Sequence, residues 1–369
     1  MRWAWVLGLT GGALAASAQD SDALAQEPAS SWWERPLLDF STDAASVLVN
    51  PFMDLAVGSA GGQIFFENTR GARFDAVVDG VWRIHGALEE RQGAADPVLT
   101  AWAFATANKQ AGTVALPGWG RAKWTDRANY LEGTPLQFDA SRAVVRMERS
   151  WERVAVASGL DNLHEGLGLQ SAFWSRHAAP LPFIGAKYTG QGWHVGGWAG
   201  AAVGSERGPA GATAESLYAR QRVNRLGAGI HRGEDWSADL LWLRLAEVPF
   251  NTATSDPAPA RHWGGAQFHV RRGPWLAYAA VAVDWRAVLS AAPGPAYMGE
   301  LVHIRWSRRR TEAVAEWHRS RTGSLRDAPA SGAPHLSLLH SGTPLTHLWG
   351  DGWASATLRI KHHVASRWA

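Results

Sequence analysis

The sequence predicts an all-β protein: a transmembrane antiparallel β-barrel of about fourteen strands, roughly 12 to 18, with a short helix in one long loop. Three observations predict it. The chain opens with the pattern of a secretory signal peptide, its later segments alternate apolar and charged residues, and short turns alternate with long loops. Strands in lipid need every backbone group paired, so such a sheet is expected to close on itself.

Residues 1–18 have the pattern of a signal peptide. Arg2 supplies a positive charge, Trp5 to Leu14 are largely apolar, and Ala16, Ser17 and Ala18 form a small-residue cleavage pattern. The alternative is a buried N-terminal helix. We expect residues 19–50 to form a periplasmic or plug-like lead-in and residues 51–369 to form the barrel, which places the protein in the cell outer membrane.

Composition narrows the function. The chain has 22 Trp against 11 Phe and 5 Tyr, and Trp concentrates at membrane interfaces and on sugar-stacking surfaces. It has no Cys, which excludes disulfides, thiolate chemistry and cysteine zinc sites. With 36 Lys and Arg against 33 Asp and Glu, the net charge of +3 gives little reason to expect a nucleic-acid partner.

The strands follow from alternation with a period of two residues. From Phe65 to Asp79, one face is apolar from Ala72 onward and the other is charged. After a turn at Gly80, apolar residues again oppose charged ones up to Arg91. Further strands are expected at 142–149, 152–160, 183–190, 193–203, 215–232, 236–248, 261–272, 275–288, 297–309, 311–321 and 353–365.

Connections between these segments are of two kinds. Short turns are expected near residues 80, 150, 191, 234, 273 and 310, and long loops at 92–135, 161–181, 250–260, 289–296 and 322–352. The first long loop contains Pro97 to Lys109, whose pattern suits a short helix that begins at a proline. Alternation of short and long connections favours an outer-membrane barrel over a soluble sandwich or propeller.

Four stretches resemble the capsule-assembly Wzi-like barrels and their Bacteroidetes relatives. These are the Asn-Thr-Arg-Gly strand around Phe66 to Arg73, the helix and Pro-Gly loop from Pro97 to Gly120, the loop from Gly159 to Pro182, and the segment from Gly342 to Gly352. The resemblance covers roughly residues 50–369 in order. Where the family has a Trp-Gly-Pro-Gly turn, this chain has His164 to Gly168 without the proline.

The resemblance implies an outer-membrane barrel that binds or helps assemble capsular or exopolysaccharide, as a lectin-like protein without a catalytic step. Sugar binding uses aromatic faces together with planar polar groups. The candidate ligand-binding residues come from three loops: Asp161, Gln170, Trp174, Arg176 and His177; Trp119, Arg121 and Trp124; His347, Trp349 and Asp351. The alternative for each is structural, as a membrane-interface aromatic or a charge that braces the lumen.

Catalytic and metal sites find little support in the sequence. His164 and Glu165 are adjacent, so their side chains are expected to point apart, with Glu165 meeting an arginine of the lumen instead of acting as an acid–base pair. We expect no metal and no cofactor. The expected partners are surface polysaccharide and outer-membrane lipids, and the expected state is a monomer. Two alternative functions remain: a hydrolase of lipid or glycan at the outer rim, and a porin-type channel.

Overall fold

The computed structural model describes residues 37–60, 62–97, 99–100, 103, 112–126, 134–169, 171–176, 178–206, 218–248, 260–284, 298–308, 311–320, 339–340, 343–344 and 354–362. The strands assigned in these residues are β1 (Leu38–Ser41), β2 (Ala45–Ala60), β3 (Gln63–Val78), β4 (Trp82–Ala94), β5 (Thr113–Leu116), β6 (Gly120–Trp124), β7 (Gln137–Ser150), β8 (Val154–Asp161), β9 (Leu181–Thr189), β10 (Trp193–Glu206), β11 (Tyr218–Arg232), β12 (Trp236–Val248), β13 (Arg261–Arg272), β14 (Trp275–Asp284), β15 (Met298–Arg308), β16 (Thr311–Ser320), β17 (Leu339–His340), β18 (Thr343–Pro344) and β19 (Ala354–His362).

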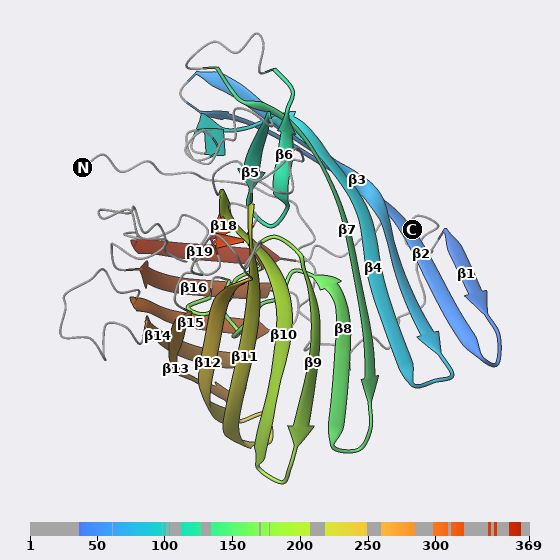
Figure 1. Ribbon diagram of the computed structural model, residues 1–369, viewed down its shortest axis with the longest axis vertical. Helices are drawn as coiled ribbons and strands as arrows, with labels where there is room; N and C mark the ends of the chain where they lie inside the picture. The colour runs from blue at the N-terminus through green and yellow to red at the C-terminus, as the bar shows by residue number, and fades with distance from the viewer. Residues whose placement is uncertain are drawn as a thin grey trace, which may run out of the picture.

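The strands form one large antiparallel meander. Within the described residues, fourteen long strands follow one another in it, namely β2 to β4, β7 to β16 and β19, which is the predicted number. Strand β7 pairs with β4 because β5 and β6 form a hairpin inserted between them. Short β1 pairs with β2, and β17 pairs with β18. Figure 1 shows the sheet strongly curved, with β1 and β19 at its two ends and no closed ring.

Short turns join the strands at one end of the sheet. The turn between β3 and β4 contains Asp79 with φ 51° and Gly80 with φ 64°. Two successive positive φ values match the right-handed twist of a tight hairpin. Other short turns at this end lie at 151–153, 190–192, 233–235 and 273–274. Apart from the tight connection between Ala60 of β2 and Gln63 of β3, the opposite end carries the longer connections. The positions of the short turns confirm those predicted near residues 80, 150, 191, 234 and 273, while residues 309–310 of the sixth predicted turn lie outside the described residues. In barrels of this type the short turns face the periplasm.

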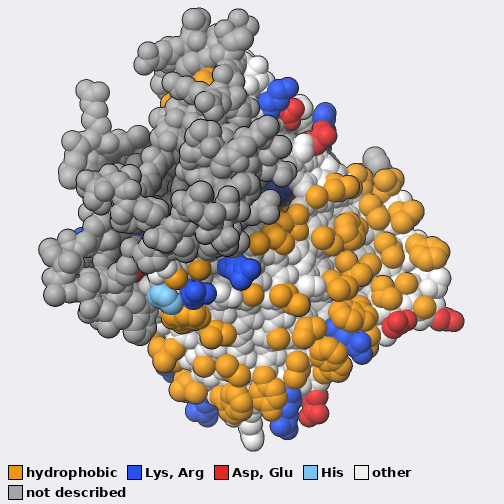
Figure 2. Space-filling view, viewed as in Figure 1, with side chains coloured by type: hydrophobic (Ala, Val, Ile, Leu, Met, Phe, Trp, Pro, Cys, Tyr) orange, Lys and Arg blue, Asp and Glu red, His pale blue; other side chains and the backbone are white. Residues whose placement is uncertain are grey.

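The outer face of the sheet is apolar. Along β14, successive residues alternate between exposed and buried, and the exposed set includes Trp275 and Val281. Leu240 on β12 and Leu358 on β19 are 69% and 74% exposed. Figure 2 shows hydrophobic side chains spread over this face. So many exposed apolar side chains on consecutive strands indicate that the sheet faces lipid.

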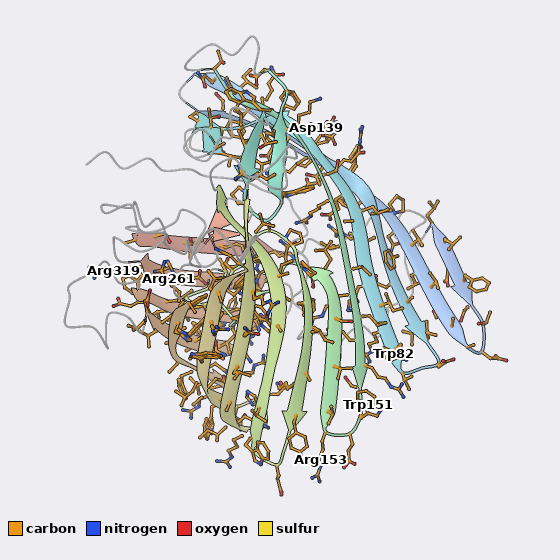
Figure 3. All side chains as sticks on the ribbon, in the orientation of Figure 1. Trp82, Asp139, Trp151, Arg153, Arg261 and Arg319 are labelled. Atoms are coloured by element: carbon orange, nitrogen blue, oxygen red, sulfur yellow. The ribbon has the colours of Figure 1, made fainter. Side chains whose placement is uncertain are left out.

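Aromatic residues mark the lower boundary of this apolar band. Trp193 and Tyr188, with ring centroids 5.2 Å apart, lie beside one short turn, and Trp275 and Trp306, 6.4 Å apart, lie beside another. Trp82 and Trp151 stand at the turn end of the strands in Figure 3, where Arg149 contacts both rings. An aromatic girdle below an apolar band is the surface of an outer-membrane β-barrel, and we assign the protein to the outer membrane on this basis.

Two stretches differ from the sequence expectation. The barrel was expected from residue 51, but β1 and β2 begin at Leu38 and Ala45. The loop expected at 92–135 holds a helical turn, with Pro97, Leu99, Thr100 and Ala103 helical as predicted, and also the unpredicted hairpin of β5 and β6. Residues 1–36, which include the expected signal peptide, lie outside the described residues. No helix among the described residues is long and apolar enough to cross a membrane.

Candidate functional site

The connection between β8 and β9 comprises residues 162–180, and its described residues (162–169, 171–176 and 178–180) fold against the concave inner face of the sheet. We call it the plug. Phe173 and Trp174 in the plug are fully buried. They share one apolar core with Leu243 of β12, Trp263 of β13 and other inward-facing residues of β9 to β15. The ring of Trp174 meets that of Trp198 on β10 edge-on, with centroids 5.2 Å apart. The plug therefore seals the inner face of one half of the sheet with an apolar core.

Two carboxylates fix the plug to the wall. Glu165 of the plug accepts hydrogen bonds from Arg225 Nη2 at 2.8 Å and from Trp198 Nε1 at 3.0 Å. The second carboxylate belongs to the sheet: Glu316 of β16 accepts a hydrogen bond from Leu169 N of the plug at 2.5 Å and contacts His303 Nδ1 at 2.8 Å. The expectation that Glu165 meets a lumen arginine is confirmed.

His164 does not act together with Glu165. Its Nδ1 accepts a hydrogen bond from Arg176 N at 3.2 Å, and its Nε2 lies 2.9 Å from Gly168 O. The imidazole thus ties the plug backbone to itself, while the neighbouring carboxylate points to the wall. This is the divergence expected of adjacent side chains, and it leaves no acid–base pair here.

Asn162 joins the plug to the insert between β4 and β7. Its Nδ2 donates to Gly118 O at 2.9 Å and to Ala178 O at 2.7 Å. Its Oδ1 accepts from Arg142 Nη1 at 3.2 Å, and the same Nη1 also donates to Gly118 O at 2.7 Å. Gly118 has φ +74°, a conformation that a side chain disfavours. One amide therefore connects the insert turn, the plug and β7.

The described residues of the insert (95–97, 99–100, 103, 112–126 and 134–136) lie above the membrane band. Asp96 Oδ1 accepts from Leu99 N at 3.0 Å, which caps the helical turn that begins at Pro97. Leu99, Leu116 and Phe138 contribute to a second buried apolar cluster, against which Trp119 packs. The Arg142 guanidinium stacks over the Trp119 ring at 4.4 Å, and Arg91 lies 5.8 Å from it. Trp119 is thus held between the insert core and two arginines of the wall.

The inner faces of β3, β4 and β7 carry a series of ion pairs that the plug core does not include. From the turn end outward, these join His85 to Asp75 at 3.4 Å, Arg146 to Glu148, Arg73 to Glu89 at 3.7 Å, Arg142 to Glu89, and Arg91 to Glu67 at 2.5 Å. Several of these side chains remain open to solvent, with Asp75 59% and Arg73 44% exposed. We call this series the charged wall.

The predicted binding residues fall into four groups. Trp119 and Arg121 in the insert and Asp161 at the end of β8 are partly exposed; Asp161 lies 3.6 Å from Arg146. Trp174 is fully buried and Trp124 is 9% exposed, so both belong to apolar cores and are not presented to a ligand. Arg176 is largely enclosed in the plug, where burial and the nearby Arg359 lower its pKa. Gln170, His177, His347, Trp349 and Asp351 lie outside the described residues.

Sequence reasoning missed the residues that organise this region, Asn162 and Arg142 above all. A partial signal existed, since Glu67, Arg73, Asp75, His85, Glu89 and Arg91 fall on the charged faces of the predicted strands. That pattern placed them in the lumen. It carried no information on which arginine pairs with which carboxylate, because the partners sit on different strands.

A group of Ser, His and Asp side chains lies at the opposite, turn end of the lumen. Ser237 Oγ is 2.8 Å from His269 Nδ1 and 3.3 Å from Asp239 Oδ2, while Asp239 Oδ1 lies 2.8 Å from His194 Nε2. Asp239 thus contacts the serine directly and orients a different histidine, and Ser237 is only 6% exposed. In the described part of the chain, no group of three or more His, Asp or Glu is placed to hold a metal ion.

Comparisons with known proteins add only distant likenesses. No family model matches the sequence, and no curated protein matches it. Among solved structures, the anion-selective porin from Comamonas acidovorans aligns with TM-score 0.40 and 9% identity, over 86% of this chain and 99% of the porin. OmpT from Vibrio cholerae aligns with TM-score 0.37 and 10% identity, over 86% and 98%. Salmonella typhi OmpF gives 0.35 and 9%, over 88% and 100%. At such scores, these likenesses say nothing about function.

Proposed function

We propose that this outer-membrane barrel binds surface polysaccharide at its outer mouth, as a lectin-like, monomeric protein that carries out no chemical step. One observation carries the proposal: Trp119, a partly exposed aromatic ring, is held in place by Arg142 and Arg91 at the outer end of the charged wall. Aromatic faces and planar guanidinium and carboxylate groups are the side chains that contact the apolar faces and the hydroxyls of sugars.

Rigidity supports this proposal. Trp119 rests on a buried apolar cluster, and its turn is fixed through Gly118 O to Asn162 and Arg142. A preformed platform loses little conformational entropy when it binds a flexible glycan. The resemblance to capsule-assembly barrels points in the same direction, because the Pro-Gly loop that carries Trp119 is one of the four matching stretches.

The test is a binding titration on the full-length protein in detergent, with size-defined fragments of the surface polysaccharide from the same strain as the probe. We expect Trp119→Ala to weaken binding about tenfold, equivalent to about 1.4 kcal/mol, and Trp119→Phe to weaken it less. Trp275→Ala, in the aromatic girdle, is the matched control and should bind as the parent does. Equal binding by Trp119→Ala and the parent would remove this site.

A channel for hydrophilic solutes is the second candidate, favoured by the solvent-exposed part of the charged wall. His85 is 41% and Asp75 59% exposed on the inner face, as expected where water or a polar solute lies against it. Liposome swelling with neutral sugars measures this directly. Swelling by the parent protein combined with absence of polysaccharide binding would replace the first proposal by the second.

A further inference from the structure

The outer, lipid-facing side of β3, β4 and β7 has a shallow cavity of about 500 Å³. Three rows of directly paired residues line it. The first row is Arg70, Glu90 and Ser141, the second Gly71, Glu89 and Arg142, and the third Ala72, Leu88 and Ala143. The first and third rows point outward, while Glu89 and Arg142 of the middle row point into the lumen. The outward side chains thus give the cavity a polar side and an apolar side.

The polar side lies at the outer boundary of the membrane band. Arg70 and Glu90 are each eight residues from the turn end of their strands, at Val78 and Trp82. Outward-facing Arg244 of β12 and Arg319 of β16 are also eight residues from theirs. Eight residues at about 3.3 Å each, tilted by about 40°, span roughly 20 Å, close to the height of the apolar band in such barrels. From this common height we place the outer-leaflet headgroups beside the polar side of the cavity.

On the polar side, one nitrogen of the Arg70 guanidinium lies outside the ion pair with Glu90. Glu90 Oε2 accepts from both Nε and Nη2 of Arg70, at 3.0 and 2.9 Å, so Nη1 takes no part in the pair. Both side chains are 52% exposed. Ser141 adds a hydroxyl in the same row. In the third row, two residues closer to the turns, Leu88 is 64% exposed beside two alanines.

We propose that this cavity binds an outer-leaflet glycolipid that carries phosphate on its saccharide headgroup. The phosphate is placed at Arg70 Nη1 and Ser141, and an acyl chain lies along Leu88, Ala72 and Ala143. Continuity with the lipid-facing band identifies the occupant as a lipid, and the guanidinium selects an anionic headgroup because arginine pairs well with phosphate. This site faces away from the lumen and is independent of glycan binding at Trp119.

The Arg70–Glu90 pair gives the proposal a signed test. A structural ion pair alone is weakened by loss of either partner. A phosphate site is weakened by loss of Arg70, but it is strengthened by loss of Glu90, whose negative charge repels the phosphate. Arg70→Gln and Glu90→Gln are therefore expected to move lipid retention in opposite directions.

The experiment reconstitutes the full chain in nanodiscs with a diphosphorylated glycolipid or with its dephosphorylated form. Native mass spectrometry then counts the glycolipids retained after detergent exchange. We expect the parent to retain the phosphorylated form about tenfold better, and Arg70→Gln to lose that preference, the change expected for one charge-assisted hydrogen bond. Glu90→Gln should retain it better than the parent, and a loss in Glu90→Gln like that in Arg70→Gln would reduce the pair to a structural ion pair. Arg244→Gln, at the same height but outside the cavity, should match the parent.

Three other outcomes also overturn the proposal. The first is equal retention of both glycolipid forms by the parent. The second is unchanged retention by Arg70→Gln. The third is an equal loss in Arg244→Gln, which reports a general attraction of the charged boundary and no defined site. Correct folding of each variant is checked by its heat-modifiable mobility in gels, so that a misfolded protein is not counted.

Discussion

Removal of the Glu165 side chain should release the plug from the barrel wall. In Glu165→Ala, Arg225 keeps only the weaker contact to Gly196 O at 3.3 Å, and Trp198 Nε1 loses its acceptor. Breaking a buried ion pair costs about 3–5 kcal/mol. Glu165 and Arg225 are 13% and 16% exposed, so water compensates in part. Together with roughly 1 kcal/mol for the indole N–H, a cost of about 3 kcal/mol follows.

Hydrogen exchange of the plug amides measures this cost locally. A loss of about 3 kcal/mol speeds exchange of protected amides such as Trp174 N–H roughly a hundredfold, if they exchange by local opening. Amides of β12 and β13, on the wall, should be unaffected and serve as an internal control. Glu165→Gln keeps an acceptor for Trp198, so its plug amides should exchange at a rate between those of the parent and of Glu165→Ala. An exchange rate of the plug amides in Glu165→Ala within threefold of the parent's, a difference of about 0.6 kcal/mol, would refute the view that Glu165 anchors the plug.

Three other substitutions test the core, the wall and the insert turn. Trp174→Ala should lower the unfolding free energy by about 3–5 kcal/mol, because the fully buried ring leaves a cavity, as urea titration in lipid vesicles will show. Arg261→Ala should lower the unfolding free energy by a similar amount, about 3–5 kcal/mol, because buried Asp284 loses the guanidinium that lies 2.8 Å away. In the same titration, the double variant Arg261→Met with Asp284→Leu should recover most of that loss, since it removes both buried charges. Gly118→Ala should cost about 1–2 kcal/mol at its positive φ and weaken glycan binding through Trp119, as calorimetry can follow.

The strands could be predicted because successive residues of a barrel strand face lipid and lumen in turn. Apolar and polar residues therefore alternate with a period of two in the sequence. The missed start of β2 has a specific cause. The change of residue pattern at Pro51 predicts the boundary between lead-in and barrel. In the structure Pro51 pairs with Ala72 of β3, and the ladder with β1 ends at Val49. A proline is tolerated where no neighbouring strand needs its N–H.

The plug shows why the site was harder to predict than the strands. The role of Glu165 followed from local reasoning, since a carboxylate next to a turn in a lumen needs a positive partner. The polar residues around Trp174 in its own loop predict a sugar-binding role for it. Its actual neighbours, Leu243 and Trp263, lie on strands far along the chain and are visible only once the loop folds inward. Non-local packing of this kind leaves no trace in residue spacing.

The inner face also explains why the plug lies against the half of the sheet formed by β9 to β15. On β12, the inward residues Leu241, Leu243 and Leu245 are 5%, 0% and 0% exposed. Such leucines would face water in an empty lumen, so the fold needs an apolar segment to cover them, and Phe173 and Trp174 supply it. On β4 the corresponding inward positions carry charged residues such as Glu89, which are stable against water or a polar ligand. Any solute or glycan that enters this lumen should therefore follow β3 to β8 and leave the plugged half undisturbed.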